Sequence, residues 1–160
     1  PFYCDYGCNI YVGDDFFSNF NLTILDEGKV TIGNHVFIGP NVSLYTACHP
    51  TDPIERRKGT EWTKPITIGN DVWIGSGCII RNNITIGDGA VIGAGSIITK
   101  DVPPYAVVVG TNKILKYRFP DEIIHKLLHI KWWEWEDQKI RSCYKLFEDP
   151  IAFIDKYHID

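Results

Sequence analysis

The chain has 160 residues, 44% of them hydrophobic, which is enough to bury one core of ordinary size. Its formal net charge of −4 is spread along the sequence, so neither nucleic acid nor an anionic membrane is expected as a partner. The longest apolar stretches fall far short of the ~20 residues of a membrane-spanning helix, and no secretory leader opens the chain, which together favour a cytoplasmic protein without membrane insertion.

A six-residue repeat runs through the first two thirds of the chain. Its earliest members, Val12, Ser18 and Ile24, are six residues apart, and a two-residue insertion near Asp26 lengthens the next step. Branched apolar residues then recur in one register, and most are followed by glycine: Ile32, Ile38, Leu44, Ile68, Ile74, Ile80, Ile86, Ile92 and Ile98. A period of six matches no face of an α-helix, and glycine in every turn would cost a helix ~1 kcal/mol each relative to alanine. The repeat predicts short strands that point one branched side chain inward, with corners where Gly, Asn or Asp fits.

Three such strands are expected to close one triangular coil, so the predicted fold is a mainly β solenoid. Small residues two positions before the inward residue, including Cys78, Ala90 and Ser96, leave room for the bulky side chain at each corner. Residues 46–64 interrupt the repeat with polar and charged residues, which predicts a loop that projects outward. Long loops in compact domains tend to be functional.

After Gly110 the pattern changes to that of a helical tail. Pro120 with two acidic residues suits a first helical turn, and an apolar stripe follows it. A second helix is predicted over 136–147, and a third at Asp149-Pro150, with the aspartate as its cap. Three tryptophans between the helices are expected to pack over the open end of the solenoid. The predicted organisation is a β-helix domain over 1–112 and a helical extension over 113–160 that packs on it.

The five cysteines are an odd and widely spaced set, which predicts free thiols rather than a disulfide framework. Cys4 and Cys8 lack the spacing and the nearby histidines of a zinc site. No metal is therefore expected.

Several stretches of the chain resemble one enzyme family, the maltose/galactoside O-acetyltransferase branch of the hexapeptide acyltransferases. They are PFYCDYGCNI at 1–10, SNFNLTILD at 18–26, IGPNVSLYTACHP at 38–50, KPITIGNDVWIGSGCII at 64–80 and IGDGAVIGAGSIITKDVPP at 86–104. The tail at 118–140 is instead similar to the xenobiotic acetyltransferase branch, which acts on streptogramins and chloramphenicol. The resemblance implies a left-handed parallel β-helix and a homotrimer with active sites at the subunit interfaces, each shared by two chains. Acetyl-CoA would lie in the groove between neighbouring chains.

The resemblance places the catalytic histidine of the family at His49, at the base of the outward loop. An imidazole can take the proton of an acceptor hydroxyl as the oxygen attacks the thioester, then return a proton to the CoA thiolate. This direct transfer needs no acyl-enzyme. Cys48 is adjacent, but neighbouring side chains often face apart, so it is not expected to be a nucleophile.

Other site residues also follow from the resemblance. Asp5, Asn19 and Glu61 fall on positions that contact the acceptor, while Glu27 replaces an aspartate common at a further acceptor position and is given no role. The positions that bind coenzyme A in the family are occupied by Trp73, Ser76, Ala94, Thr99 and Lys100. Sugar-acetylating members carry an N-terminal helical segment that helps to build the acceptor pocket. Because this chain has no methionine and begins at Pro1, we expect a further segment to precede it.

Three other functions are weighed against O-acetylation of a carbohydrate. A γ-type carbonic anhydrase needs three histidines around zinc, whereas residues 1–110 contain two. A non-enzymatic scaffold would not need the histidine loop or the donor groove. Acetylation of an amino sugar or of a xenobiotic remains the alternative, because the tail resembles the xenobiotic branch.

Overall fold

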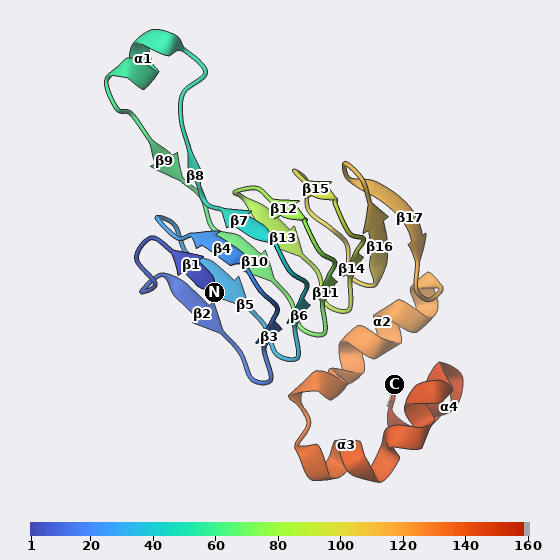
Figure 1. The fold of residues 1–160 in the computed structure, drawn as a ribbon. Helices are drawn as coiled ribbons and strands as arrows, with labels where there is room; N and C mark the ends of the chain where they lie inside the picture. The colour runs from blue at the N-terminus through green and yellow to red at the C-terminus, as the bar shows by residue number, and fades with distance from the viewer. Residues whose placement is uncertain (159–160) are drawn as a thin grey trace. The chain divides into compact units, whose positions relative to one another are not determined.

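Most of the chain forms a parallel β-helix of short strands in the computed structural model, which describes residues 1–158 (Figure 1). The strands are β1 (Phe2–Cys4), β2 (Ile10–Val12), β3 (Phe17–Ser18), β4 (Leu22–Leu25), β5 (Val30–Ile32), β6 (Phe37–Ile38), β7 (Ser43–Tyr45), β10 (Ile66–Ile68), β11 (Trp73–Ile74), β12 (Ile79–Ile80), β13 (Ile84–Ile86), β14 (Val91–Ile92), β15 (Ile97–Ile98), β16 (Ala106–Val109) and β17 (Lys113–Tyr117). They build a five-stranded sheet (β1-β4-β7-β12-β15), a four-stranded sheet (β13-β10-β5-β2) and a six-stranded sheet (β17-β16-β14-β11-β6-β3). From β1 to β15 the strands of the coils enter the three sheets in rotation, so each of these coils contributes one strand to every wall.

The inward residues of the repeat stack in register to form the core. Ile68 of β10, for example, lies opposite Ile32 on one side and Ile86 on the other. All nine residues predicted from Ile32 to Ile98 are between 0% and 2% exposed, and the small residues Cys78, Ala90 and Ser96 are fully buried. Because one fully buried branched side chain stabilises a fold by about 1.5–3 kcal/mol, this stack is the main source of stability in the solenoid. The predicted β-helix is therefore confirmed.

The corners of neighbouring coils approach so closely that some of them admit only glycine. A Cβ at Gly75 would lie 2.6 Å from the backbone nitrogen of Ala94 in the next coil. Polar side chains tie the corners together: the N–H of Asn34 donates to Asn70 Oδ1 (2.9 Å), and the N–H of Asn70 donates to Asp88 Oδ1 (2.7 Å). Turn residues of the repeat thus direct the chain from one wall to the next, and their side chains also join one coil to the following coil.

The first coil keeps the register of the repeat without its burial. Val12 lies opposite Ile32, yet its side chain is 52% exposed, whereas Ile24 one coil further is buried. The cause is position, because β1, β2 and β3 are the outermost strands of their sheets and no further described strand covers them. Residues of these three strands and their turns, together with Leu22 and Ile24 of β4, line an apolar hollow of about 430 Å³.

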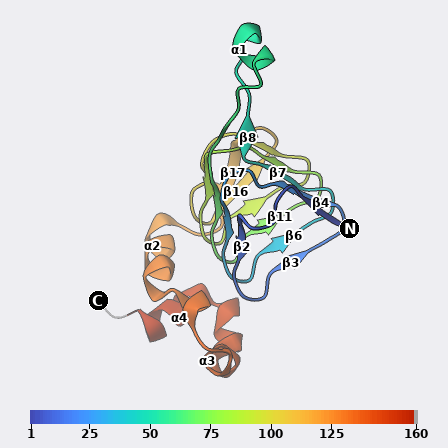
Figure 2. The same ribbon diagram turned by 90° about the vertical axis from the view of Figure 1, so that its left-hand side faces the viewer.

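The outward loop predicted at 46–64 is confirmed, and it has secondary structure of its own. Strands β8 (Ala47–Cys48) and β9 (Trp62–Thr63) pair in antiparallel fashion, and helix α1 (Pro53–Arg57) forms the tip. Figures 1 and 2 show this ribbon standing well away from the coils. Its base is fixed by buried Thr46, whose hydroxyl donates to the carbonyl of Leu25 (2.7 Å) and accepts from the N–H of Gly28 (2.8 Å).

The chain divides into two compact units, Pro1–Lys116 and Tyr117–Asp160. The boundary lies a few residues beyond the one expected at 112, because β17 joins the six-stranded sheet. The second unit contains α2 (Asp121–Ile130), the 3-10 turn η1 (Trp132–Glu134), α3 (Asp137–Cys143), the 3-10 turn η2 (Tyr144–Glu148) and α4 (Pro150–Tyr157). Asp149 caps α4 as predicted, accepting from the N–H groups of Ile151 and Ala152. The single helix predicted over 136–147 is wrong in its second half, where the chain tightens into η2.

Aromatic side chains pack on one another inside the second unit. The rings of Trp132 and Phe147 are 4.9 Å apart, and those of Phe147 and Phe153 are 5.0 Å apart. Phe153 is almost completely buried. The tryptophan cluster therefore serves the core of this unit, and its predicted packing over the solenoid end stays a prediction.

Replacing Ile98 by alanine should lower the free energy of unfolding by about 2–5 kcal/mol, because the cavity forms inside the stack where Ile98 is fully buried. Its neighbour Ile97 points outward and is 41% exposed, so Ile97→Ala should cost less than about 1 kcal/mol. Urea unfolding at one protein concentration measures both. Equal losses in the two variants would contradict the inward orientation of the repeat.

Candidate active site

The predicted site residues lie on two edges of the three-sided solenoid and on one of its walls. The first edge, here the loop edge, joins the five-stranded sheet to the four-stranded sheet and contains Asp5, His49, Glu61, Thr99 and Lys100. The second, the glycine edge, joins the six-stranded sheet to the five-stranded sheet and contains Asn19, Ser76 and Ala94. Trp73 lies on β11 in the six-stranded wall.

His49 follows β8 directly and is oriented by the opposite arm of the ribbon. Pairing of Cys48 with Trp62 brings Thr60 and Glu61 across from it. The imidazole Nδ1 lies 3.1 Å from the carbonyl oxygen of Thr60. Because a carbonyl can only accept, Nδ1 carries the proton in this contact, and the neutral ring keeps its lone pair on Nε2. The side chain is 56% exposed, so Nε2 is accessible to a substrate.

Glu61 faces the same imidazole, with Oε1 4.0 Å from Nε2 of His49. A carboxylate at this distance stabilises the ring once it has taken up a proton. His49 and Glu61 therefore face each other at the foot of the loop, whereas the sequence placed Glu61 only among the acceptor contacts. Cys48 takes no part in this contact, because its thiol is directed at the backbone oxygen of His49 (3.9 Å).

Asp5 is held at the loop edge by a buried aspartate from the next coil. The Asp26 carboxylate accepts from the N–H groups of Asp5 (3.1 Å), Tyr6 (2.9 Å) and Asn9 (3.3 Å). Burial alone would raise the pKa of Asp26, but these backbone N–H groups, with that of Gly7, outweigh it and lower the pKa below its ordinary value. The two-residue insertion of the repeat thus supplies an anion that shapes the first corner.

Glu27 is the site residue to which the sequence assigned no role. Its pKa is raised, first by burial and then by the negative charge and the hydrogen-bonding carboxyl of Asp5, with a smaller contribution from Glu61. One of its oxygens, Oε2, is buried without a hydrogen-bond partner. Three carboxyl groups therefore converge beside His49. The signal in the sequence was the insertion itself, which places Glu27 where the repeat has no residue.

Asn19 is not brought to this cluster by its own chain. It lies at the glycine edge beside a hollow lined by Phe2, Phe17 and Phe20, and its Oδ1 accepts from the N–H of Phe20 (2.7 Å). One wall of the solenoid separates the two edges, a width on the order of 15 Å for four to five extended residues. Among the described residues, the predicted acceptor contacts are thus divided between two edges.

The predicted donor residues of the glycine edge expose a strip of backbone with little side chain above it. Ser76 and Ala94 occupy equivalent corners one coil apart, and the N–H of Gly95 donates to the carbonyl of Ser76 (2.8 Å). Gly77 and Gly95 both have positive φ, and a Cβ at either would meet nothing within 4 Å. The strip can therefore accept a long, thin ligand close to the main chain.

The donor residues of the loop edge are fixed by Asn112, whose Oδ1 accepts from the N–H groups of Thr99 (2.8 Å) and Lys100 (3.2 Å). Its Nδ2 donates to Thr99 Oγ1 (2.7 Å). On the six-stranded wall, Trp73 is 58% exposed and lines a hollow of about 360 Å³ with Phe37 and His35. The five predicted donor residues therefore lie on three different surfaces of one chain.

Within the part of the chain that the structure describes, no three His, Cys, Asp or Glu side chains are grouped so that they could hold a metal ion. The other histidine of the solenoid, His35, instead faces Asp15, 3.4 Å from its Nε2. Across the same residues, no helix has the length and apolar character needed to cross a membrane.

Comparison with known proteins points to a single family. Residues 65–100 match the bacterial transferase hexapeptide family (six repeats). The galactoside O-acetyltransferase of Escherichia coli is 54% identical over 69% of this chain and 54% of its own length. The maltose O-acetyltransferase structure from Clostridium difficile is 49% identical, with a TM-score of 0.73 over 75% of this chain and 65% of that chain.

A hexapeptide-repeat acetyltransferase from Vibrio cholerae is 42% identical, with a TM-score of 0.74 over 75% of this chain and 69% of that chain. A second structure of the Vibrio protein is a complex with acetyl coenzyme A. The chain spans between 54% and 61% of the length of the first curated relatives that it matches. Its identity to the Vibrio protein over more than two thirds of that protein, together with the coiled fold, shows that the chain belongs to the hexapeptide-repeat acetyltransferases.

Proposed function

We propose that the protein transfers the acetyl group of acetyl-CoA to a hydroxyl of a carbohydrate, with His49 as the general base. One observation carries the proposal: the Thr60 carbonyl accepts a hydrogen bond from Nδ1–H of His49, which leaves the lone pair of Nε2 to act as the base. The acetyl-CoA complex of the Vibrio relative supports the choice of donor. The names of the Escherichia and Clostridium relatives support a sugar as acceptor.

The reaction needs one proton to move twice. Nε2 of His49 takes the proton of the acceptor hydroxyl while its oxygen attacks the thioester carbonyl carbon. The tetrahedral intermediate then collapses, the carbon–sulfur bond breaks, and the imidazolium returns the proton to the leaving thiolate. Glu61, 4.0 Å away, stabilises the imidazolium between these steps. No covalent enzyme intermediate is formed.

Acetyl-CoA is proposed to bind along the exposed backbone of Ser76 and Ala94, and to reach Thr99 and Lys100. Free N–H groups of such a strip can hold the amides of the pantetheine arm and stabilise the oxyanion of the intermediate. The ammonium of Lys100 can pair with a phosphate of coenzyme A. Trp73 would close one side of the groove.

The acceptor is proposed to be a carbohydrate because Asp5, Glu27 and Glu61 supply several carboxyl oxygens beside the base. Ionised carboxylates accept hydrogen bonds and a protonated one can also donate, which suits a ring with several hydroxyl groups. Carboxylates would equally attract the ammonium form of an amino sugar, which keeps N-acetylation as the second candidate. Assays with hydroxyl-only sugars, amino sugars and chloramphenicol separate these acceptors.

A homotrimer would bring the two edges together. The His49 ribbon of one chain and the Asn19, Ser76 and Ala94 strip of another can meet only across an interface, because one wall separates them within a chain. Exposed Phe17, Phe37 and Trp73 form a row on the six-stranded wall that an adjoining chain would cover. The five cysteines are free thiols, which suits a reducing cytoplasm as the proposed location.

His49→Ala should reduce acceptor-dependent thiol release from acetyl-CoA by about 100-fold or more, since general-base catalysis contributes on this scale. A thiol reagent measures release across the acceptor panel. His125→Ala is the matched control, because His125 is exposed on α2 of the second unit. Unchanged activity in His49→Ala would overturn the mechanism. If none of the acceptors tested gave thiol release, a non-enzymatic scaffold would be favoured.

Glu27→Gln should raise stability at pH 7 and lower catalytic efficiency. The folded pKa of Glu27 lies above its ordinary value of 4.5, so the stability it contributes is full below that pH and is lost as the pH rises through the folded pKa. Gln imitates the protonated form and removes this loss, so the gain should be present at pH 7 and absent near pH 4. Loss of an acceptor contact should lower kcat/KM for the acceptor about tenfold. Urea unfolding and initial rates measure the two effects, and Glu148→Gln is the exposed control.

If Glu27→Gln stabilised the protein equally at both pH values, neither the burial of the ionised carboxylate nor its repulsion by Asp5 and Glu61 would be the cause. If stability rose while kcat/KM for the acceptor stayed the same, Glu27 would not contact the acceptor.

A further inference from the structure

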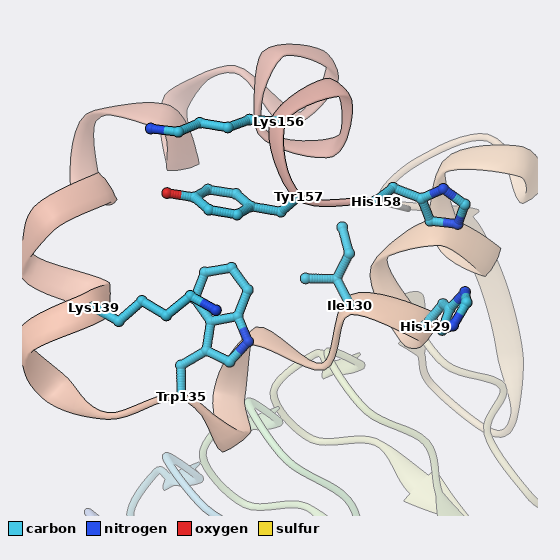
Figure 3. A pocket seen from close by; sticks show the side chains of 7 residues that line it. All are labelled: His129, Ile130, Trp135, Lys139, Lys156, Tyr157 and His158. Atoms are coloured by element: carbon cyan, nitrogen blue, oxygen red, sulfur yellow. The ribbon is translucent and has the colours of Figure 1, made fainter. Parts of the chain in front are cut away.

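A pocket of about 360 Å³ is lined by residues of the second unit alone, none of which belongs to the proposed active site (Figure 3). Residues of three helices and their ends line it: His129, Ile130, Trp135, Lys139, Lys156, Tyr157 and His158. The volume falls in the range of small-molecule sites, and α2, α3 and α4 each contribute to it. The proposed acetyl transfer uses none of these side chains.

The charge of the lining is one-sided. Among the described residues that line it are two lysines and two histidines but no aspartate or glutamate, although the chain as a whole has a formal net charge of −4. Over residues 1–158, neither Lys139 nor Lys156 forms an ion pair, whereas Lys126 and Lys131 of the same unit both do. The pocket therefore concentrates positive charge in an acidic protein.

Aromatic rings position these charges without neutralising them. Lys139 Nζ lies 3.4 Å from the ring centroid of Trp135 and 5.6 Å from that of Tyr157, and Lys156 Nζ lies 5.2 Å from the Tyr157 ring. A cation over a ring is attracted by the quadrupole and keeps its formal charge, so it can still pair with an anion. The lysines are thus held in place and available.

The imidazoles occupy the other end of the pocket. His129 and His158 meet edge to face, with ring centroids 5.2 Å apart. In Figure 3 they lie beyond Ile130 from the aromatic rings, while Tyr157 lies between Lys156 and Lys139, and Lys139 lies against Trp135. Ammonium groups beside aromatic rings suit a ligand that carries both an anion and a flat ring.

The geometry points to a binding site for an organic phosphate with a planar ring, such as a nucleoside monophosphate. A phosphate monoester carries nearly two negative charges at neutral pH, so it pairs with an ammonium group more strongly than a single carboxylate does. Its base can stack on Trp135 or Tyr157, as bases do on aromatic side chains. This site is separate from the acetyl-transfer reaction and does not depend on it.

Isothermal titration calorimetry on the whole chain, with saturating acetyl-CoA present, tests the assignment. The probes are UMP and GMP, whose bases do not occur in coenzyme A, and their parts uridine and inorganic phosphate. At least one nucleotide should bind saturably, and uridine and phosphate should each bind at least about tenfold more weakly, because each makes half of the contacts. Benzoate tests an aromatic carboxylate in the same way.

Charge variants locate the binding. Lys139→Gln with Lys156→Gln should weaken nucleotide binding about tenfold or more, whereas Lys139→Arg with Lys156→Arg, which keeps charge and ring contacts, should stay within about threefold. Lys145→Gln is the matched control, an exposed lysine of the same unit outside the pocket. Thermal unfolding shows whether each variant is folded, and the arginine pair provides the comparison if the glutamine pair is not.

Three results would overturn the assignment. They are the absence of saturable binding by either nucleotide, equal binding by the wild-type chain and a folded glutamine variant, and benzoate binding as tight as that of the nucleotide. The last result would assign the pocket to carboxylates.

Discussion

The structure depends on one packing constraint: each sixth residue must fill the narrow interior of a three-walled coil. Ile68, Ile74 and Ile80 enter it from the three walls of one coil, and each is covered by its equivalents one coil before and after. A strand between two corners is then only two to four residues long, so the backbone turns at short intervals and close corners such as Gly75 must lack a side chain. Outward positions escape this constraint, and the proposed chemistry uses them.

Most of the solenoid could be predicted because the constraint repeats. The inward residues from Ile32 to Ile98 and the outward loop followed from spacing alone. Where the repeat ends, spacing says less: Val12 keeps the register, yet burial also requires a covering strand, and the six-residue pattern cannot report whether one exists. In the tail, the helix predicted over 136–147 tightened at Tyr144, because an apolar stripe fits a 3-10 turn as readily as another α-helical turn.

The candidate site could be predicted only where a local motif marks it. His49 was identified because its loop resembles that of the maltose/galactoside O-acetyltransferases, and the ribbon places a carbonyl and a carboxylate at its two nitrogens. Glu27 was given no role from the sequence, because its raised pKa comes from burial and from the carboxyl groups of Asp5 and Glu61, which surround it only after the chain has coiled. Asn19, predicted beside the histidine, lies on the other edge, and that separation gives the trimer its catalytic purpose in our proposal.

Mixing two inactive variants measures this central claim most directly. His49→Ala removes the base from the loop edge, and Asn19→Ala removes the predicted acceptor contact from the glycine edge. If each site combines the two edges of neighbouring chains, random co-assembly should leave about a quarter of the sites with both residues and restore about a quarter of native thiol release. Activity no higher than that of the separate variants, in oligomers shown to have exchanged subunits, would contradict a site shared between chains.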